Sequence, residues 1–199
     1  MKLLLARHGE SVANVLGVIS NRDLPHPLTE QGRRQAAGLA EWVRAYAPTR
    51  ALASPVVRAR ETAEIVSAAL GVPWQIAEAL REYDCGILEG RGDEAAWAEH
   101  RALAEEWLAG HGDRRITGGE SLDDIRARFV PFIEGLVREY GPTPQTLLLI
   151  GHGGLYRWAL PAVLRGADAA FFEAHPFGYA GCWVAELRGD ALVCVGWRE

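Results

Sequence analysis

The chain has 199 residues, of which 49% are hydrophobic and 24% charged, a composition that supports a sizeable globular core. Its net charge of -5 argues against a broad basic face, so we expect no nucleic-acid partner. The apolar run at the N-terminus is too short to span a bilayer, and no signal-peptide pattern follows it. We therefore expect one domain over 1–199, no membrane partner and a cytoplasmic location.

The first half of the chain alternates short apolar runs with helical patterns. The elements expected there, in chain order, are a strand at 2–6, a loop at 9–28, a helix at 29–46, a strand at 50–54, a helix at 57–70 and a strand at 74–77. Thr29 is a suitable N-cap for the first helix, and Pro48 marks its end.

The second half continues the same alternation. The elements expected there are a helix at 93–109, a helix from Ser121 to Tyr140, a strand at 146–150, a helix from 153 to about 165 with Pro161 inside, and hairpin strands at 182–188 and 191–197. Ser121 and Asp124 resemble a capping box, and Pro131 predicts a kink in the helix that they open. Strands that alternate with helices indicate an α/β fold, a three-layer α/β/α sandwich with a mostly parallel sheet and an antiparallel edge.

The three cysteines, Cys85, Cys182 and Cys194, are sparse and lack CxxC spacing. This argues against a disulfide framework and a zinc site, and we expect small core residues. A two-residue turn at Gly189-Asp190 would place Cys194 opposite Ala185 and Cys182 opposite Trp197.

Two strands end in similar histidine motifs. Arg7-His8-Gly9-Glu10 follows the first strand, and Gly151-His152-Gly153-Gly154 follows the strand at 146–150. Both motifs reach the carboxyl edge of the sheet, where ligands bind in open α/β folds. Arginine there suits a phosphate or a carboxylate, and histidine suits proton transfer, metal binding or covalent catalysis. Either motif alone could also be a solvated surface turn.

Two further segments carry charged residues that bear on function, the start of the helix at 57–70 and the stretch from Glu82 to Glu89. Arg58 falls in the first turn of the helix at 57–70, where it opposes the helix dipole. This placement makes sense if a bound anion lies over the same turn. The segment from Glu82 to Glu89 holds three carboxylates, and one of them close to a phosphate would have a raised pKa that suits a general acid.

Together these segments resemble the histidine phosphatase superfamily, whose fold is phosphoglycerate mutase-like. The matching segments, in order, are Arg7-His8-Gly9-Glu10, Leu28-Thr29 with Gly32, Ser54-Pro55 with Arg58 and Thr62-Ala63, Glu82 with Gly86 and Glu89-Gly90, Gly118-Gly119-Glu120-Ser121, and His152-Gly153-Gly154. The resemblance covers most of the chain.

The resemblance implies a phosphohistidine intermediate on His8. It assigns Arg7, Arg58, His152 and Asn14 to the phosphate pocket, adds the amide of Gly153, and makes Glu82 the general acid. A hydrogen bond from the second ring nitrogen of His8 to a backbone carbonyl would hold the required tautomer. The scheme needs no metal and no cofactor. Glu10 and Glu120 are expected to be structural, and His26, His100 and His111 to be surface or loop residues.

The expected activity is hydrolysis of a small phosphorylated metabolite. A cofactor-dependent phosphoglycerate mutase is the alternative, although about 28 residues between Gly90 and Gly119 leave room for only one helix, which favours hydrolysis. An inactive module that binds a phospho-ligand is a third alternative. The segments at 18–27 and 174–181 depart from the family pattern and are expected to border the leaving group. The sequence leaves monomer and homodimer open.

Overall fold

The computed structural model describes residues 1–198, apart from the side chains of Ala169 and Glu173. Within this part of the chain, seven strands form one sheet in the order β3-β2-β4-β1-β6-β7-β5. The strands are β1 (Lys2–Arg7), β2 (Arg50–Ala53), β3 (Trp74–Ile76), β4 (Thr146–Gly151), β5 (Leu164–Arg165), β6 (Cys182–Arg188) and β7 (Ala191–Arg198). Neighbouring strands are parallel except at β6, which is antiparallel to both β1 and β7.

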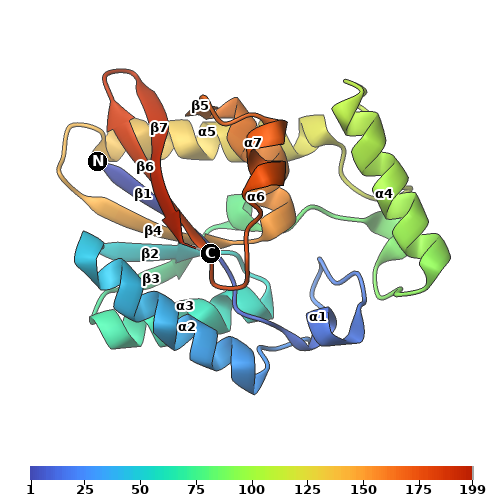
Figure 1. Ribbon diagram of the computed structural model, residues 1–199, viewed down its shortest axis with the longest axis horizontal. Coiled ribbons are helices and arrows are strands. Elements are labelled where there is room, and N and C mark those ends of the chain that lie inside the picture. The colour runs from blue at the N-terminus through green and yellow to red at the C-terminus, as the bar shows by residue number, and fades with distance from the viewer. Residues whose placement is uncertain (199) are drawn as a thin grey trace.

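Helices cover both faces of the sheet, as Figure 1 shows. The α-helices are α1 (Val12–Leu16), α2 (Glu30–Val43), α3 (Val57–Leu70), α4 (Glu94–Leu108), α5 (Leu122–Tyr140), α6 (Gly153–Ala159) and α7 (Ala169–Ala174). Helices α2 and α3 lie on one face and α5 and α6 on the other, while α4 stands away from the sheet. The predicted α/β sandwich is therefore present.

The core alternates along the central strands because successive side chains of a strand point to opposite faces. Leu3 and Leu5 of β1 pack in the cluster that contains α5 and α6. Leu4 and Ala6 pack against α2 and α3. Small alanines on both of these helices pack in this cluster and let the helices approach the sheet closely.

Two predicted helix caps are present. The Thr29 hydroxyl accepts a hydrogen bond from the Gly32 amide at 3.0 Å. The Ser121 hydroxyl accepts one from the Asp124 amide, and the Asp124 carboxylate accepts one from the Ser121 amide. The helix that Ser121 opens runs to Tyr140 with Pro131 inside it.

The expected helix at 29–46 is present as α2, which continues into one 3₁₀ turn at Arg44–Tyr46. Two local predictions were wrong. The expected loop at 9–28 contains α1. The helix after His152 ends at Ala159, because Pro161 has no N–H to continue it, and the chain passes through a 3₁₀ turn into β5. Helix α7, begun by Asp168 as N-cap, was not anticipated.

The hairpin register differs from the prediction at one cysteine. Cys194 pairs with Ala185 as expected, but Cys182 pairs with Arg198 rather than with Trp197. A register irregularity between Val184 and Ala185 inserts one extra residue into the partner strand and shifts the rest of the ladder. Within the described chain the three cysteines are free thiols, two buried and Cys194 half-buried.

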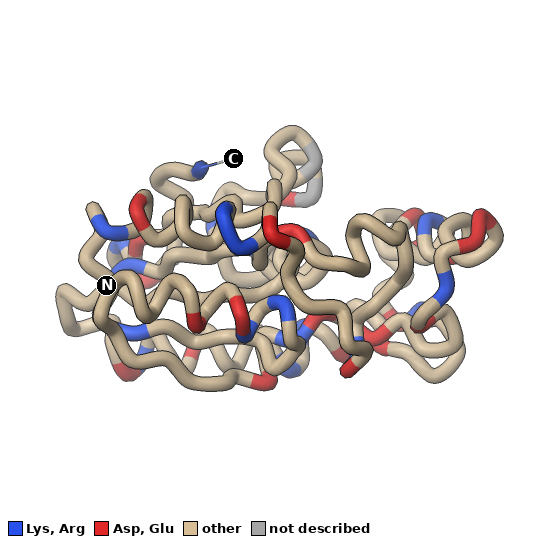
Figure 2. The backbone as a smooth tube through the Cα atoms, turned by 90° about the horizontal axis from the view of Figure 1, so that it is seen from below, with Lys and Arg blue, Asp and Glu red and all other residues tan. Residues whose placement is uncertain are grey.

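Charged residues of both signs are interspersed along the backbone (Figure 2). In the described residues 1–198, none of the helices combines the length and the apolar character needed to cross a bilayer.

Candidate active site

Three adjacent strands deliver the centre of the site. Arg7 at the end of β1 is in register with Gly151 at the end of β4, so His8 and His152 leave the sheet side by side. Their ring centroids are 5.0 Å apart. Ser54 follows β2, which pairs with the other edge of β4. The sequence predicted that these residues share a sheet edge, and the strand order makes them neighbours.

His8 is held as a neutral imidazole with one available lone pair. Its side chain is buried, and Nδ1 lies 2.6 Å from the carbonyl oxygen of Gly9. Because a carbonyl only accepts, Nδ1 carries the proton and Nε2 accepts a hydrogen bond from Arg58 Nε at 2.9 Å. Burial first, and then the charges of Arg58 and Arg7, lower the pKa of His8 well below its usual value. The expected carbonyl hydrogen bond is therefore present.

Glycine at position 9 lets this turn approach α2. A Cβ built on Gly9 would lie 2.4 Å from the carbonyl oxygen of Gly32, and one on Gly32 would collide with the carbonyl of Glu10. The two glycines thus allow the backbone after β1 to pack against the start of α2. The Gly9 amide also donates to the Thr62 hydroxyl of α3, which ties the turn to a second helix.

Two guanidinium groups, that of the buried Arg58 and that of the half-buried Arg7, face the site with unused donors. Arg58 is 4% exposed, and Arg7 is held by its hydrogen bond to the Phe177 carbonyl and by the Tyr179 ring, 4.3 Å from its Cζ. Arg58 Nη1 and Arg7 Nε are buried and make no hydrogen bond. Burial above all, and then repulsion from Arg7, lower the pKa of Arg58 to about 10 against the opposing effect of Glu82. Buried cations with unpaired donors are costly, so this geometry favours a bound anion.

His152 is fully buried at the N-cap of α6. Arg58 Nη2 donates to its Nδ1 at 3.2 Å, and its Nε2 lies 2.7 Å from the Ser54 hydroxyl. Burial, followed by the charge of Arg58, lowers the pKa of His152 well below its usual value. His152 is therefore neutral in this state, since its Nδ1 accepts from Arg58 and only Nε2 carries a proton.

The N-terminus of α6 holds the carboxylate of Glu82. Oε2 accepts a hydrogen bond from the Gly154 amide at 3.1 Å, and Oε1 accepts one from the Leu155 amide at 2.6 Å. Burial raises the pKa of Glu82, although Arg58 and these amides oppose the shift. A Cβ on Gly154 would lie 2.6 Å from the Tyr83 ring and 2.9 Å from Glu82 Oε1, so this position requires glycine. Sequence reasoning had assigned the Gly153 amide to the phosphate and had missed the amides that hold Glu82.

Asn14 and Gly153 line the same cavity. Asn14 Oδ1 accepts hydrogen bonds from the amide and the hydroxyl of Ser11, which leaves its NH₂ group as the donor toward a ligand. Gly153 lies against the Arg7 side chain, and a Cβ there would approach its Cδ and Nε to 3.4 Å. The structure thus brings together all seven site residues predicted from the sequence, in a cavity of about 260 Å³ and its immediate surroundings.

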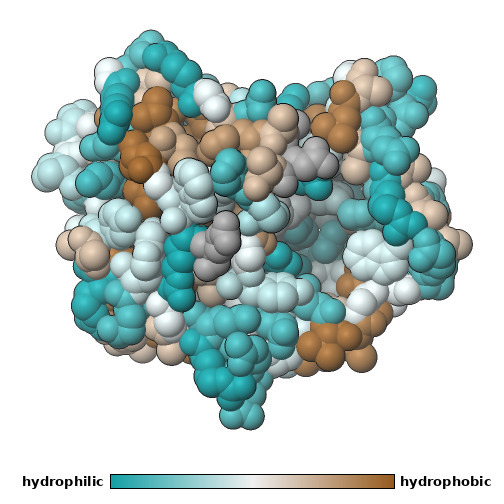
Figure 3. Space-filling model, in the orientation of Figure 1, coloured by the Kyte–Doolittle hydropathy of each residue, from teal (hydrophilic) through white to brown (hydrophobic). Residues whose placement is uncertain are grey.

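Helix α4 contributes residues that sequence reasoning missed. Figure 3 shows the surface hollowed between α4 and the body of the molecule. Trp97 and His100 of α4 line the site cavity together with Tyr83. His100 Nε2 lies 2.6 Å from the Tyr83 hydroxyl, so the prediction of His100 as a surface or loop residue was wrong. His100 follows Trp97 by three residues, so the two side chains lie on one face of α4, and this spacing was the available signal in the sequence.

The segment at 18–27 is held against the segment that carries Glu82. The Glu89 carboxylate accepts hydrogen bonds from the amides of Asn21 and Arg22. The Arg22 guanidinium pairs with Asp84 at 2.9 Å, and the Asn21 side chain donates to the Tyr83 carbonyl. Two of the three carboxylates in 82–89 are therefore structural.

Glu10 and Glu120 also have structural contacts, as predicted. Glu10 Oε1 accepts from the Thr29 hydroxyl at 2.6 Å. Glu120 pairs with Arg128 at 2.7 Å and accepts a hydrogen bond from the Asp84 amide. These contacts join the loops around the site to α2 and α5.

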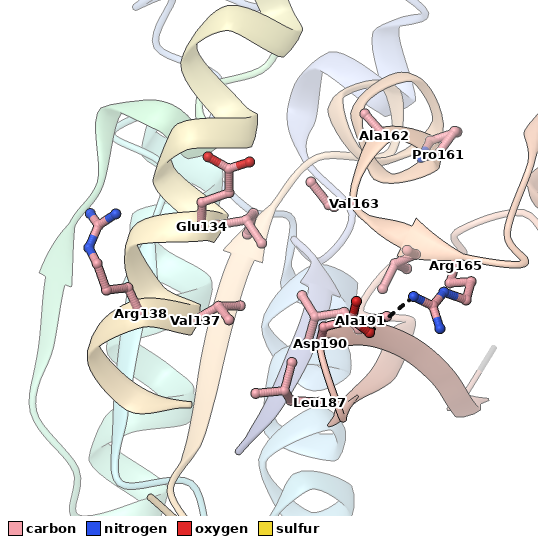
Figure 4. Close-up of a pocket in the computed structure, with 13 residues that line it drawn as sticks. Glu134, Val137, Arg138, Pro161, Ala162, Val163, Arg165, Leu187, Asp190 and Ala191 are labelled. Carbon is pink, nitrogen blue, oxygen red and sulfur yellow. Dashed lines mark hydrogen bonds and ion pairs between the residues drawn. The ribbon is translucent and has the colours of Figure 1, made fainter. Parts of the chain in front are cut away.

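A larger cavity lies elsewhere, between α5, β5 and the β6–β7 turn (Figure 4). It measures about 490 Å³, and Arg165 and Asp190 face each other there at 3.2 Å. None of the predicted site residues lines it, and its described lining holds no histidine or cysteine. Across the described chain, no three His, Cys, Asp or Glu side chains are grouped to hold a metal ion.

Residues 3–199 match the family model of the histidine phosphatase superfamily (branch 1), and the chain belongs to this family. The protein named probable phosphoglycerate mutase GpmB from Salmonella paratyphi C (strain RKS4594) is 29% identical over 203 residues, which cover 96% of this chain and 93% of that protein.

Two solved structures illustrate the similarity in fold. Mycobacterial glucosyl-3-phosphoglycerate phosphatase aligns with a TM-score of 0.81 and 25% identity, covering 99% of this chain and 96% of that one. The alpha-ribazole phosphatase of Shigella flexneri aligns with a TM-score of 0.80 and 26% identity, covering 98% and 95%. The chain is thus similar to proteins named for different substrates.

Proposed function

We propose that this protein is a phosphatase that hydrolyses a small phosphomonoester through a phosphohistidine intermediate on His8. The observation that carries the proposal is the hydrogen-bonding of His8, whose Nδ1–H donates to the Gly9 carbonyl while the Nε2 lone pair accepts from the buried Arg58. A neutral nucleophile beside unpaired guanidinium donors suits attack on a phosphate dianion.

In the first step His8 Nε2 attacks phosphorus as the bond from phosphorus to the leaving oxygen breaks. Arg58 Nε, which donates to His8 Nε2 in the described state, passes its hydrogen bond to a phosphoryl oxygen. Arg58 Nη1 and Arg7 Nε supply further donors for the charge that spreads over the equatorial oxygens. Asn14 donates from its NH₂ group.

Glu82 serves both steps as acid and then as base. Its raised pKa favours the protonated form that gives a proton to the leaving oxygen. The resulting carboxylate takes a proton from water as the water oxygen attacks phosphorus. The bond from phosphorus to Nε2 breaks, inorganic phosphate leaves and His8 is neutral again.

The name of the curated relatives supports a second candidate, cofactor-dependent phosphoglycerate mutase activity. Between Gly90 and Gly119 the chain forms only α4 and its loops, and α4 leaves the site cavity open to solvent on one side. Open access of water to phospho-His8 favours hydrolysis. Interconversion of 2- and 3-phosphoglycerate, measured with and without 2,3-bisphosphoglycerate, separates the two activities.

The test of the phosphatase is hydrolysis of p-nitrophenyl phosphate without added metal, together with chemical quenching to trap an acid-labile phosphoprotein. We expect His8→Ala to abolish both turnover and the trapped phosphoprotein. His111→Ala, which changes an exposed histidine paired with Glu106, should leave both unchanged. Turnover that persists in His8→Ala would overturn the proposal, and phosphate binding with no turnover by any variant would favour a binding module.

A further inference from the structure

A second cavity opens directly from the site. It measures about 370 Å³ and shares Arg7, Tyr83, His100, Gly153 and Gly154 with the site cavity. We call it the side cavity. Because Arg7, Gly153 and Gly154 line both cavities, a leaving group attached to a phosphoryl group at His8 can extend into it.

Two arginines outside the phosphate pocket line the side cavity. Arg157 lies one turn after Gly153 on α6, about 6 Å farther along the helix axis. Arg101 reaches the same space from α4. The described lining contains no Asp or Glu, so with Arg7 it presents three positive charges and no negative one.

Neither arginine is committed to a strong ion pair among the described side chains. Arg101 pairs with Glu94, but both side chains are more than half exposed, and such pairs are weak and easily exchanged. Arg157 is half-buried, with its Cζ 5.0 Å from the Trp158 ring. A planar guanidinium held over an aromatic ring is oriented to bind an anion with both of its arms.

Apart from Tyr83 and His100, which hydrogen-bond to each other, the rest of the lining is glycine or apolar. Trp158, Phe172 and Phe177 are buried, and Pro176 completes this side of the cavity. Carbon atoms of a short leaving group can pack there while its charge faces the arginines. A neutral leaving group would leave the arginine charges uncompensated.

Building on the proposed function, we propose that the side cavity selects phosphomonoesters whose leaving group carries a second anionic group, bound by Arg157 with help from Arg101. The preferred substrates are thus short phosphorylated acids or bisphosphates, rather than phosphorylated alcohols or nucleosides.

The test compares D-3-phosphoglycerate with glycerol 3-phosphate, which have three carbons each and differ in a carboxylate. We expect kcat/KM to favour phosphoglycerate by on the order of 10- to 100-fold, the usual effect of a hydrogen-bonded charge. Arg157→Met should bring the ratio close to one, and Arg157→Lys should restore part of it. Arg165→Met, a matched surface change in the larger cavity, should keep the wild-type ratio. A comparison of kcat/KM for fructose 1,6-bisphosphate and fructose 6-phosphate tests in the same way whether a second phosphate can replace the carboxylate.

The proposal would be overturned if both members of each pair reacted at equal rates, or if Arg157→Met lost the same factor in kcat/KM for both members. Preference for a nucleoside monophosphate would also overturn it. Calorimetric titration of the three-carbon compounds into His8→Ala measures the same selectivity without turnover. If the proposed hydrolysis is wrong, no phosphate is released from any substrate, but the binding preference for D-3-phosphoglycerate is still measured in His8→Ala.

Discussion

The phosphate end of the site and its leaving-group side are built in different ways. Arg7, His8 and His152 stand at the ends of paired strands, and Arg58 is buried in the first turn of α3. The opposite side consists of α4, the segment at 18–27 and the residues around α7, which are joined to the core by side-chain contacts such as the Tyr83–His100 hydrogen bond. The sheet positions the reacting groups, whereas the side chains of the loops and of α4 shape the space for the leaving group.

This difference predicts that changes at the phosphate end affect every substrate. The largest effect is expected for Arg58→Met, which removes a buried charge and the donor to His8 Nε2. We expect kcat/KM for p-nitrophenyl phosphate to fall on the order of 10²- to 10³-fold, as for loss of a preorganised donor. Arg58→Lys should recover little, because lysine lacks the fork that contacts both histidines.

Arg60→Met is the matched control, since Arg60 lies on the same helix but is exposed. A comparable loss of activity in Arg60→Met, or full activity in Arg58→Lys, would show that the guanidinium fork of Arg58 is not required at the phosphate end of the site.

Gly154→Ala probes the point where the two sides meet. The added Cβ would approach the Glu82 carboxylate and the Tyr83 ring too closely and would displace the proton donor. We expect a loss on the order of 10- to 100-fold for an alkyl phosphate, whose alkoxide leaves poorly without protonation, and a smaller loss for p-nitrophenyl phosphate. Glu82→Gln should show the same dependence on the leaving group.

Gly196→Ala, where no atom lies within 4 Å of the added Cβ, should behave as wild type. Equal losses of alkyl and aryl activity in Gly154→Ala would argue against proton donation by Glu82.

The smallest effect concerns stability. Burial and the nearby arginines lower the pKa values of His8 and His152, so the unfolded chain binds more protons than the folded one below the unfolded histidine pKa of about 6.5. The free energy of unfolding should fall as pH decreases from there toward the folded pKa values, by up to about 1.4 kcal/mol per pH unit for each histidine.

Denaturant titration of the wild type and of His152→Asn at pH 7.5 and 5.5 checks this prediction. The variant should lose less stability between the two pH values, and an identical loss in both proteins would contradict the assignment of His152 as a buried neutral group.

The sequence by itself determined the chemistry of the phosphate end. Arg7, His8, Arg58 and His152 each stand next to a strong local signal, an apolar strand or a helix start, and parallel strands must bring such signals to one edge of the sheet. Glu82 was found through its family motif, because an acidic loop has no local pattern that separates a proton donor from the structural Asp84 and Glu89.

Only the tertiary structure decided how these groups act on one another. The strand order placed His8 beside His152, and burial lowered the pKa of both histidines. Burial also raised the pKa of Glu82, while the start of α6 committed the Gly154 amide to its carboxylate. The contributions of His100, Arg101 and Arg157 depend on where α4 lies relative to α6, a distance between segments far apart in the chain that local periodicity does not encode.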